Sequence, residues 1–156
     1  MKNFQNKTKI IKISIQLRAV ARLAFILWAF VLASCLFVVW NSVTRGGNYR
    51  ENYVAIGGIV EMVFAMIVSL NFFRFFDRLK NGALFDAKTV GHLTHAGQWW
   101  LAFWILGFSF GEVGNLWLGT KMALSFGQLF ASLAVIFVAW LLKEAQTLQE
   151  EQELTV

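Results

Sequence analysis

Four apolar stretches constrain the fold of this chain more than any other feature of its sequence. They cover residues 23–43, 53–73, 98–118 and 122–142. Each is close to the ~20 apolar residues that a helix needs to cross the hydrocarbon core of a bilayer. The composition agrees, because 58% of the residues are hydrophobic and only 15% are charged, whereas about a quarter are charged in a soluble domain. The sequence therefore predicts an all-α integral membrane four-helix bundle, a single domain over residues 1–156.

The Lys and Arg residues are distributed unequally around these stretches. Eleven of the 14 lie in residues 1–22, 74–97 and 143–156, and three lie in the two remaining loops. Positive residues beside membrane spans mark the cytoplasmic side, so we expect both termini and the 74–97 connection to be cytoplasmic. Because such residues also meet anionic lipid, the net charge of +5 indicates contact with the lipid bilayer and no direct binding of nucleic acid.

The 74–97 connection carries local signals for a helix–turn–helix. An Asn-Gly pair follows the second stretch, and Gly82 can adopt the left-handed conformation that ends a helix. Asp86 is a favourable N-cap for the next helix, and Phe85 and Val90 have the spacing of a hydrophobic staple. We therefore expect one helix to end before this turn and a cytoplasmic helical extension to begin after it.

Both histidines, His92 and His95, lie in this connection. Their spacing lets them approach each other on a helix surface, but a closed zinc site needs four ligands, and Asp77 and Asp86 are not at a recognised spacing. Polar residues at the membrane interface are one interpretation, and pH sensing is another, because histidine titrates near neutral pH. The sequence predicts no metal site and no cofactor.

Glu61 is the most informative single residue, because it lies inside the second apolar stretch. A carboxyl group there is costly unless it is protonated, paired or facing a water-filled cavity. Gln128, Glu112 and Ser34 lie at similar depths in the other stretches, so we predict an intramembrane polar cluster of these four residues. Hydrogen bonding between helices and a role in proton coupling or ligand binding are both consistent with this pattern.

Small residues at four-residue spacing indicate close packing of membrane helices. Gly107 and Gly111 form such a pair in the third stretch, Gly127 begins another in the fourth, and Gly57 lies one turn before Glu61. We expect these residues to pack within the bundle, although the same pairs also suit a dimer interface. The oligomeric state is therefore left open.

Acidic residues dominate the last segment, 143–156, which we expect to continue the fourth helix beyond the membrane. A solvated helix end is one interpretation, and docking onto the basic N-terminal segment or onto a partner is another. The candidate partner-binding residues are Glu144, Glu150, Glu151 and Glu153.

The connection resembles a motif of a bacterial family of uncharacterised membrane proteins, DUF2975. The stretch "NGALFDAKTVGHLTHAG" is similar to that motif, and the four-span layout and the acidic ending "LQEEQELTV" are similar too. The resemblance implies a multi-pass protein of the bacterial cytoplasmic membrane with no assigned catalytic residue. It also suggests regulation, since some members are encoded beside a small helix-turn-helix transcription regulator. Together with Asp86, the motif falls on Gly82, Leu84, Phe85, Val90, Leu93 and Gly97.

Two functions are consistent with these observations. The first is a non-enzymatic, membrane-linked regulatory module that binds a small cytoplasmic helix-turn-helix transcription regulator. The second is a small transporter or protection factor that uses the carboxyl group of Glu61, although a sequence with no proline lacks one usual sign of broken transporter helices. We expect no enzymatic activity, because the sequence has no recognisable nucleophile–base combination and no phosphate-binding loop.

Overall fold

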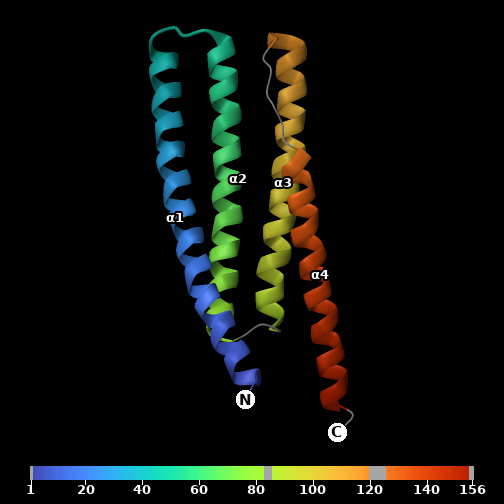
Figure 1. The fold of residues 1–156 in the computed structure, drawn as a ribbon. Coiled ribbons are helices and arrows are strands. Elements are labelled where there is room, and N and C mark those ends of the chain that lie inside the picture. The colour runs from blue at the N-terminus through green and yellow to red at the C-terminus, as the bar shows by residue number, and fades with distance from the viewer. Residues whose placement is uncertain (1, 83–85, 120–125, 155–156) are drawn as a thin grey trace.

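Four long helices make up the protein. The computed structural model describes residues 2–82, 86–119 and 126–154, and Figure 1 shows its helices α1 (Lys2–Thr44), α2 (Tyr49–Lys80), α3 (Ala87–Leu118) and α4 (Phe126–Leu154). No strand occurs in these three ranges. The prediction of an all-α fold with four helices is therefore confirmed.

Each of the four helices is long and apolar enough to cross a membrane. A multi-pass membrane protein follows from their length and composition. α1 alone has 43 residues, which corresponds to about 65 Å at 1.5 Å per residue, whereas the hydrocarbon core is about 30 Å thick. The helices therefore continue well beyond the predicted spans.

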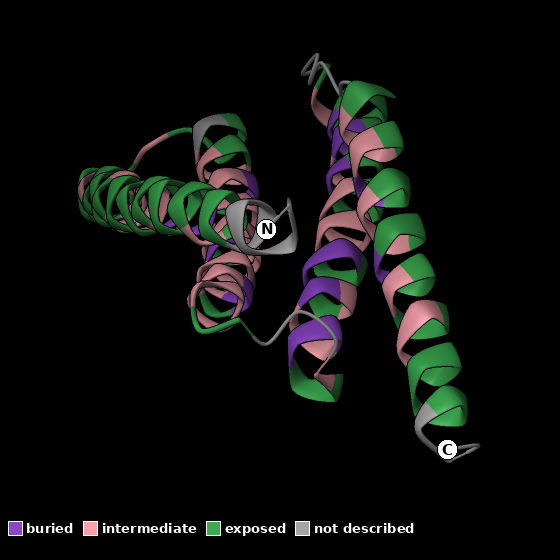
Figure 2. Cartoon of the chain, turned by 60° about the horizontal axis from the view of Figure 1, so that its bottom comes forward, coloured by how far each residue is buried: buried purple, intermediate pink, exposed green. Residues whose placement is uncertain are grey.

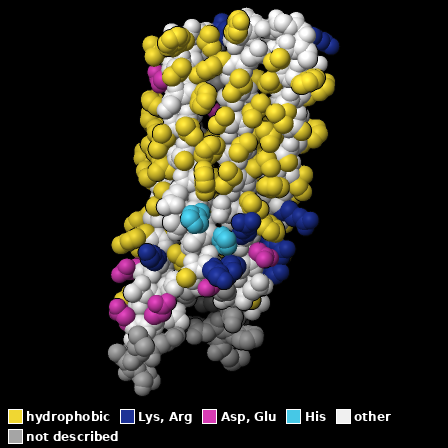
Figure 3. Space-filling model, turned by 180° about the vertical axis from the view of Figure 1, so that it is seen from behind, with side chains coloured by type: hydrophobic (Ala, Val, Ile, Leu, Met, Phe, Trp, Pro, Cys, Tyr) yellow, Lys and Arg dark blue, Asp and Glu magenta, His cyan; other side chains and the backbone are white. Residues whose placement is uncertain are grey.

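These continuations gather at one end of the molecule. Both chain ends lie there (Figure 1), and on the face seen in Figure 3 most charged side chains lie at this end, below a band of hydrophobic side chains. The two histidines lie at the boundary between them. We call this region the charged end, and it consists of residues 2–22, 74–82, 86–97 and 143–154.

The helices pack only against their neighbours in the chain. α1 packs on α2, α2 on α3 and α3 on α4, and no other pair of helices approaches closely in the part of the chain that the structure describes. Figure 2 shows the helices as two groups, and the contact between α2 and α3 joins the α1–α2 pair to the α3–α4 pair. The arrangement is therefore open between α1 and α4.

Hydrogen bonds join α2 to α3 at the end of the molecule that lies opposite the charged end. The Tyr53 hydroxyl donates to the Phe110 carbonyl at 2.8 Å, and the Arg50 guanidinium donates to the Gly119 carbonyl at 2.9 Å. The side chain of Asn48 caps the start of α2 by accepting from the Arg50 N–H at 3.3 Å. These contacts fix the two helix ends relative to each other.

A small buried cluster joins α2, α3 and α4 beside the charged end. Its members Phe75, Leu93 and Ala139 are 7%, 5% and 1% exposed. Where the alternative is contact with water, burying a Phe or Leu side chain contributes about 1.5–3 kcal/mol. This cluster therefore contributes hydrophobic stabilisation to the junction of α2, α3 and α4.

The predicted turn between α2 and α3 is present. α2 ends at Lys80, and Gly82 has a φ of 80°, as the glycine was expected to have. Asp86 occupies the N-cap position with an extended backbone, but its side chain makes no capping hydrogen bond. The prediction that Asp86 is the N-cap residue is therefore confirmed, but its carboxylate accepts a hydrogen bond from Arg78 and none from the first turn of α3. The predicted staple involves Phe85, which with Leu84 lies outside the described residues.

Candidate functional site

A cavity of 310 Å³ lies among the predicted membrane spans and is lined by all four helices. α2 contributes most of its wall, with Glu61, Met62, Ala65, Val68 and Ser69. The other three helices contribute Trp28, Trp100, Phe103 and Gln128.

The α2 wall follows from helical spacing. Glu61, Ala65 and Ser69 succeed one another at four-residue intervals, which places them on one face. The small side chains of Ala65 and Ser69 leave space that larger residues would fill, and the facing aromatic rings supply the remaining wall. The predicted stripe on α2 therefore faces inward and borders a cavity.

The structure brings two members of the predicted polar cluster together. Glu61 and Gln128 line the same cavity, although no hydrogen bond or ion pair to Glu61 occurs among the described residues. Hydrogen bonding of Glu61 between helices is therefore not seen. Its carboxyl group instead borders open space.

The other two members of that cluster lie elsewhere. Glu112 is exposed on α3, and the exposed Ser34 hydroxyl donates to the Phe30 carbonyl of its own helix at 3.0 Å. Neither residue lines the cavity. Depth in the bilayer was the basis for including them, and depth does not determine which face of a helix a residue occupies.

Three of the four predicted packing glycines are buried. Gly57, Gly107 and Gly111 are enclosed by neighbouring helices, whereas Gly127 is exposed. Gly127 follows directly after the start of α4 at Phe126. Packing of this glycine within the bundle is therefore not seen in the described part of the chain.

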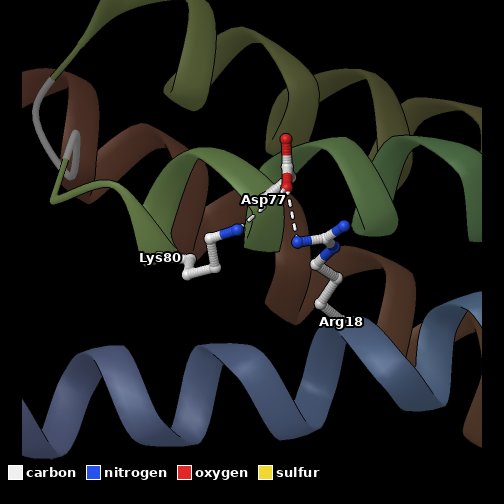
Figure 4. Close-up of polar contacts among 3 residues, drawn as sticks. All are labelled: Arg18, Asp77 and Lys80. Atoms are coloured by element: carbon white, nitrogen blue, oxygen red, sulfur yellow. Dashed lines mark ion pairs between the residues drawn. The ribbon is translucent and has the colours of Figure 1, made fainter.

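At the charged end, an ion pair ties α1 to α2. Figure 4 shows Arg18 of α1 and Lys80 of α2 directed at the carboxylate of Asp77, at 2.9 Å and 4.0 Å. The Arg18 guanidinium also lies over the ring of Phe73, 5.2 Å from its centroid. Because the partners lie in different helices, no spacing in the sequence could have revealed this contact.

A second ion pair spans the turn between α2 and α3. Arg78 donates to the Asp86 carboxylate at 2.5 Å. Nearby, burial lowers the pKa of His92, and the charges of Arg74, Arg78 and His95 lower it further. No group of three or more His, Cys, Asp or Glu side chains that could hold a metal occurs among the described residues.

A polar groove of 440 Å³ lies between α3 and α4 at the charged end. Its walls include His95, Gln98, Lys143 and Gln146, and Glu150 closes one side. Glu150 accepts a hydrogen bond from Gln146 at 2.8 Å, which orders this part of α4. The groove offers donors and acceptors to a binding partner.

The predicted acidic residues lie along the same helix. Glu144, Glu150 and Glu151 are exposed on α4, and α4 continues as helix to Leu154. The tail was expected to prolong the fourth helix, and it does. The side chain of Glu153 lies outside the described residues.

One comparison with known proteins identifies a relationship. The family model DUF2975, described as a protein of unknown function, matches residues 44–156. The chain belongs to this family. No curated protein and no solved structure matches this chain. The DUF2975 match covers α2, α3 and α4 completely, whereas α1 lies before it apart from its last residue.

The DUF2975 motif residues in the connection have structural roles. Val90 and Leu93 are 4% and 5% exposed, and Gly97 lies in close contact with α4. A Cβ atom at position 97 would lie 2.6 Å from Ile136 Cγ1 and 3.1 Å from the Ile136 backbone nitrogen. In this DUF2975 chain the described part of the motif therefore builds the junction of α2, α3 and α4.

Proposed function

We propose that this protein is a non-enzymatic, membrane-linked regulatory module whose charged end binds a cytoplasmic partner. The observation that carries the proposal is the construction of the charged end, in which four helices extend beyond their predicted spans. Two ion pairs join α1 to α2 and α2 to the start of α3 there. A partner can bind specifically to a surface whose helix ends are held in fixed positions. A shift of α2 or α4 in the membrane would alter it.

The partner that fits this surface is a small helix-turn-helix transcription regulator. Such a regulator carries a basic DNA-binding surface, and Glu144 and Glu150 present exposed carboxylates on α4. The groove between α3 and α4 lies beside them and adds hydrogen-bonding groups. Coupling between a membrane signal and such a site is typically ~1–3 kcal/mol, which changes partner occupancy about 5–150-fold.

The test is identification of the partner followed by membrane fractionation. Affinity purification from gently solubilised membranes and mass spectrometry should yield a small DNA-binding protein. That protein should co-sediment with membranes that contain the full-length chain, and truncation after Lys143 should release it. Replacing Glu144 and Glu150 by Lys should have the same effect, whereas Arg45→Glu at the opposite end should not.

Two results would overturn the proposal. Unchanged co-sedimentation after truncation would exclude α4 as the docking site, provided that the truncated chain remains inserted in the membrane. Absence of any DNA-binding partner with the full-length chain would exclude the regulatory function itself.

A second candidate function is a small transporter or protection factor, and the cavity beside Glu61 favours it. Cells that lack the protein would then be more sensitive to a toxic membrane-soluble compound. The full-length chain would restore resistance and Glu61→Gln would not, although the variant inserts normally. Equal restoration by both chains would exclude this function.

A further inference from the structure

The intramembrane cavity has two chemically different parts. Glu61 and Gln128 supply oxygen and amide groups, and Trp28, Trp100 and Phe103 supply apolar ring surface. Along α2 the wall runs from residue 61 to residue 69, which is about 12 Å at 1.5 Å per residue. The cavity therefore suits a molecule with a polar head and an apolar body.

The arrangement of α1 and α4 favours access to the cavity from the bilayer. α1 and α4 each contribute a lining residue, Trp28 and Gln128, but these helices do not pack against each other where the structure describes them. The outer faces of both helices expose large apolar side chains such as Phe30 and Phe130, as lipid-facing helices do. A ligand that enters on this side must therefore dissolve in lipid.

The charge expected on the polar head of the ligand follows from Glu61. Its carboxyl group has no hydrogen-bond or ion-pair partner in the described part of the chain. An intramembrane carboxyl group is costly unless it is protonated, paired or in a polar surrounding, and a cationic ligand would supply the pairing. An ammonium group supplies both charge and hydrogen-bond donors. The faces of tryptophan rings also attract cations, and two tryptophans line this cavity.

We infer that this cavity binds a lipophilic amine, with the ammonium group at Glu61 and the apolar body against Trp28, Trp100 and Phe103. The inference deepens the second candidate function, on which it rests, by naming the class of ligand. Binding does not require transport, and it is measured on the purified chain alone. Failure of either idea can therefore be recognised separately.

The experiment uses the full-length protein in nanodiscs of phosphatidylcholine, with dansylcadaverine as the probe. This compound is a fluorescent primary amine, and its dansyl group accepts excitation energy from tryptophan. Saturable energy transfer above that of a probe titration into empty nanodiscs is expected. The N-acetylated form of the same probe has no positive charge and should bind more weakly.

Variants then locate the site. Glu61→Gln keeps the shape of the side chain and should weaken binding of the amine about 10- to 100-fold, the range for loss of a charge-assisted hydrogen bond. It should leave binding of the acetylated probe unchanged. Glu112→Gln is the matched control, because Glu112 lies at a similar depth but is exposed and does not line the cavity.

Ala65→Phe provides an independent variant, because it places a ring in the cavity while leaving the carboxyl group of Glu61 in the chain. It should abolish saturable binding of both probes, with helical content and resistance to detergent unfolding as checks of folding. Equal affinity of the amine for the wild-type chain and Glu61→Gln would overturn the inference. So would equal affinity of the two probes for the wild-type chain, or unaltered binding by a folded Ala65→Phe protein.

Discussion

At the scale of single residues, Gly97 shows how the connection motif determines packing. Its missing side chain lets α3 approach the backbone of Ile136 on α4. Gly91 lies in the same helix, but a Cβ atom there would have no neighbour within 4 Å. The two glycines therefore differ in packing, although both are helical.

Gly97→Ala should destabilise the protein, whereas Gly91→Ala should stabilise it. Alanine favours a helix over glycine by up to about 1 kcal/mol at both positions. At position 97 the added methyl group meets Ile136, and overpacking of this kind costs about 1–3 kcal/mol. Unfolding by increasing sodium dodecyl sulfate measures both effects. A gain in stability for Gly97→Ala equal to that of Gly91→Ala would show that α4 is not held at this point.

His92 should make stability depend on pH. Burial, Arg74, Arg78 and His95 lower its pKa in the folded protein, so the unfolded chain, with an ordinary value of about 6.5, binds the proton more strongly. The contribution of neutral His92 to stability is therefore fully present above about pH 6.5. This contribution is lost as the pH falls toward the lowered pKa. His92→Gln should reduce this loss, as measured by unfolding at several pH values. An unchanged pH dependence in His92→Gln would contradict the assignment.

At the scale of the helices, the ion pair between Arg18 and Asp77 connects α1 to the rest of the molecule. Both side chains are partly exposed, so solvent and salt screen their attraction. Arg18 makes a second contact with the ring of Phe73, which does not depend on Asp77. Asp77 also lies 4.0 Å from Lys80 in its own helix, but such a pair contributes only about 0.2–0.5 kcal/mol. The contribution of Arg18 should therefore exceed that of Asp77.

Asp77→Asn should cost at most about 1 kcal/mol, the usual range for a partly exposed pair. Arg18→Gln should cost more, because contact of a cation with an aromatic ring contributes a further ~0.5–1 kcal/mol. Unfolding of both single variants and of the double variant at low and high salt separates the two contacts. Equal costs for the single variants would show that the contact with Phe73 contributes nothing.

At the scale of the whole molecule, the side of the membrane that each end faces is a prediction from the distribution of Lys and Arg. In a chain with Cys35 replaced by Ala, Tyr49→Cys should react with a membrane-impermeant maleimide in intact cells. Ala87→Cys should react only after the cells are permeabilised. Both positions are exposed, so access of the reagent decides the result. Labelling of Ala87→Cys in intact cells would reverse the orientation.

The sequence predicted the helices well because span length and hydropathy are local properties of a chain. The turn at Gly82 was predictable for the same reason. Contacts between side chains of different helices were not predictable, since hydropathy does not show which helices are neighbours. Depth alone related Glu61 to Gln128 correctly and to Ser34 and Glu112 incorrectly.

The length of α1 gives the molecule a mechanical property. Residues 2–22 precede the predicted span and continue the same helix, which makes an arm of about 31 Å. Membrane helices change tilt when the bilayer becomes thicker or thinner. A tilt change of about 10° would swing the far end of this arm through ~5 Å. Small changes in bilayer thickness are therefore magnified into displacements at the charged end that are longer than an ion pair.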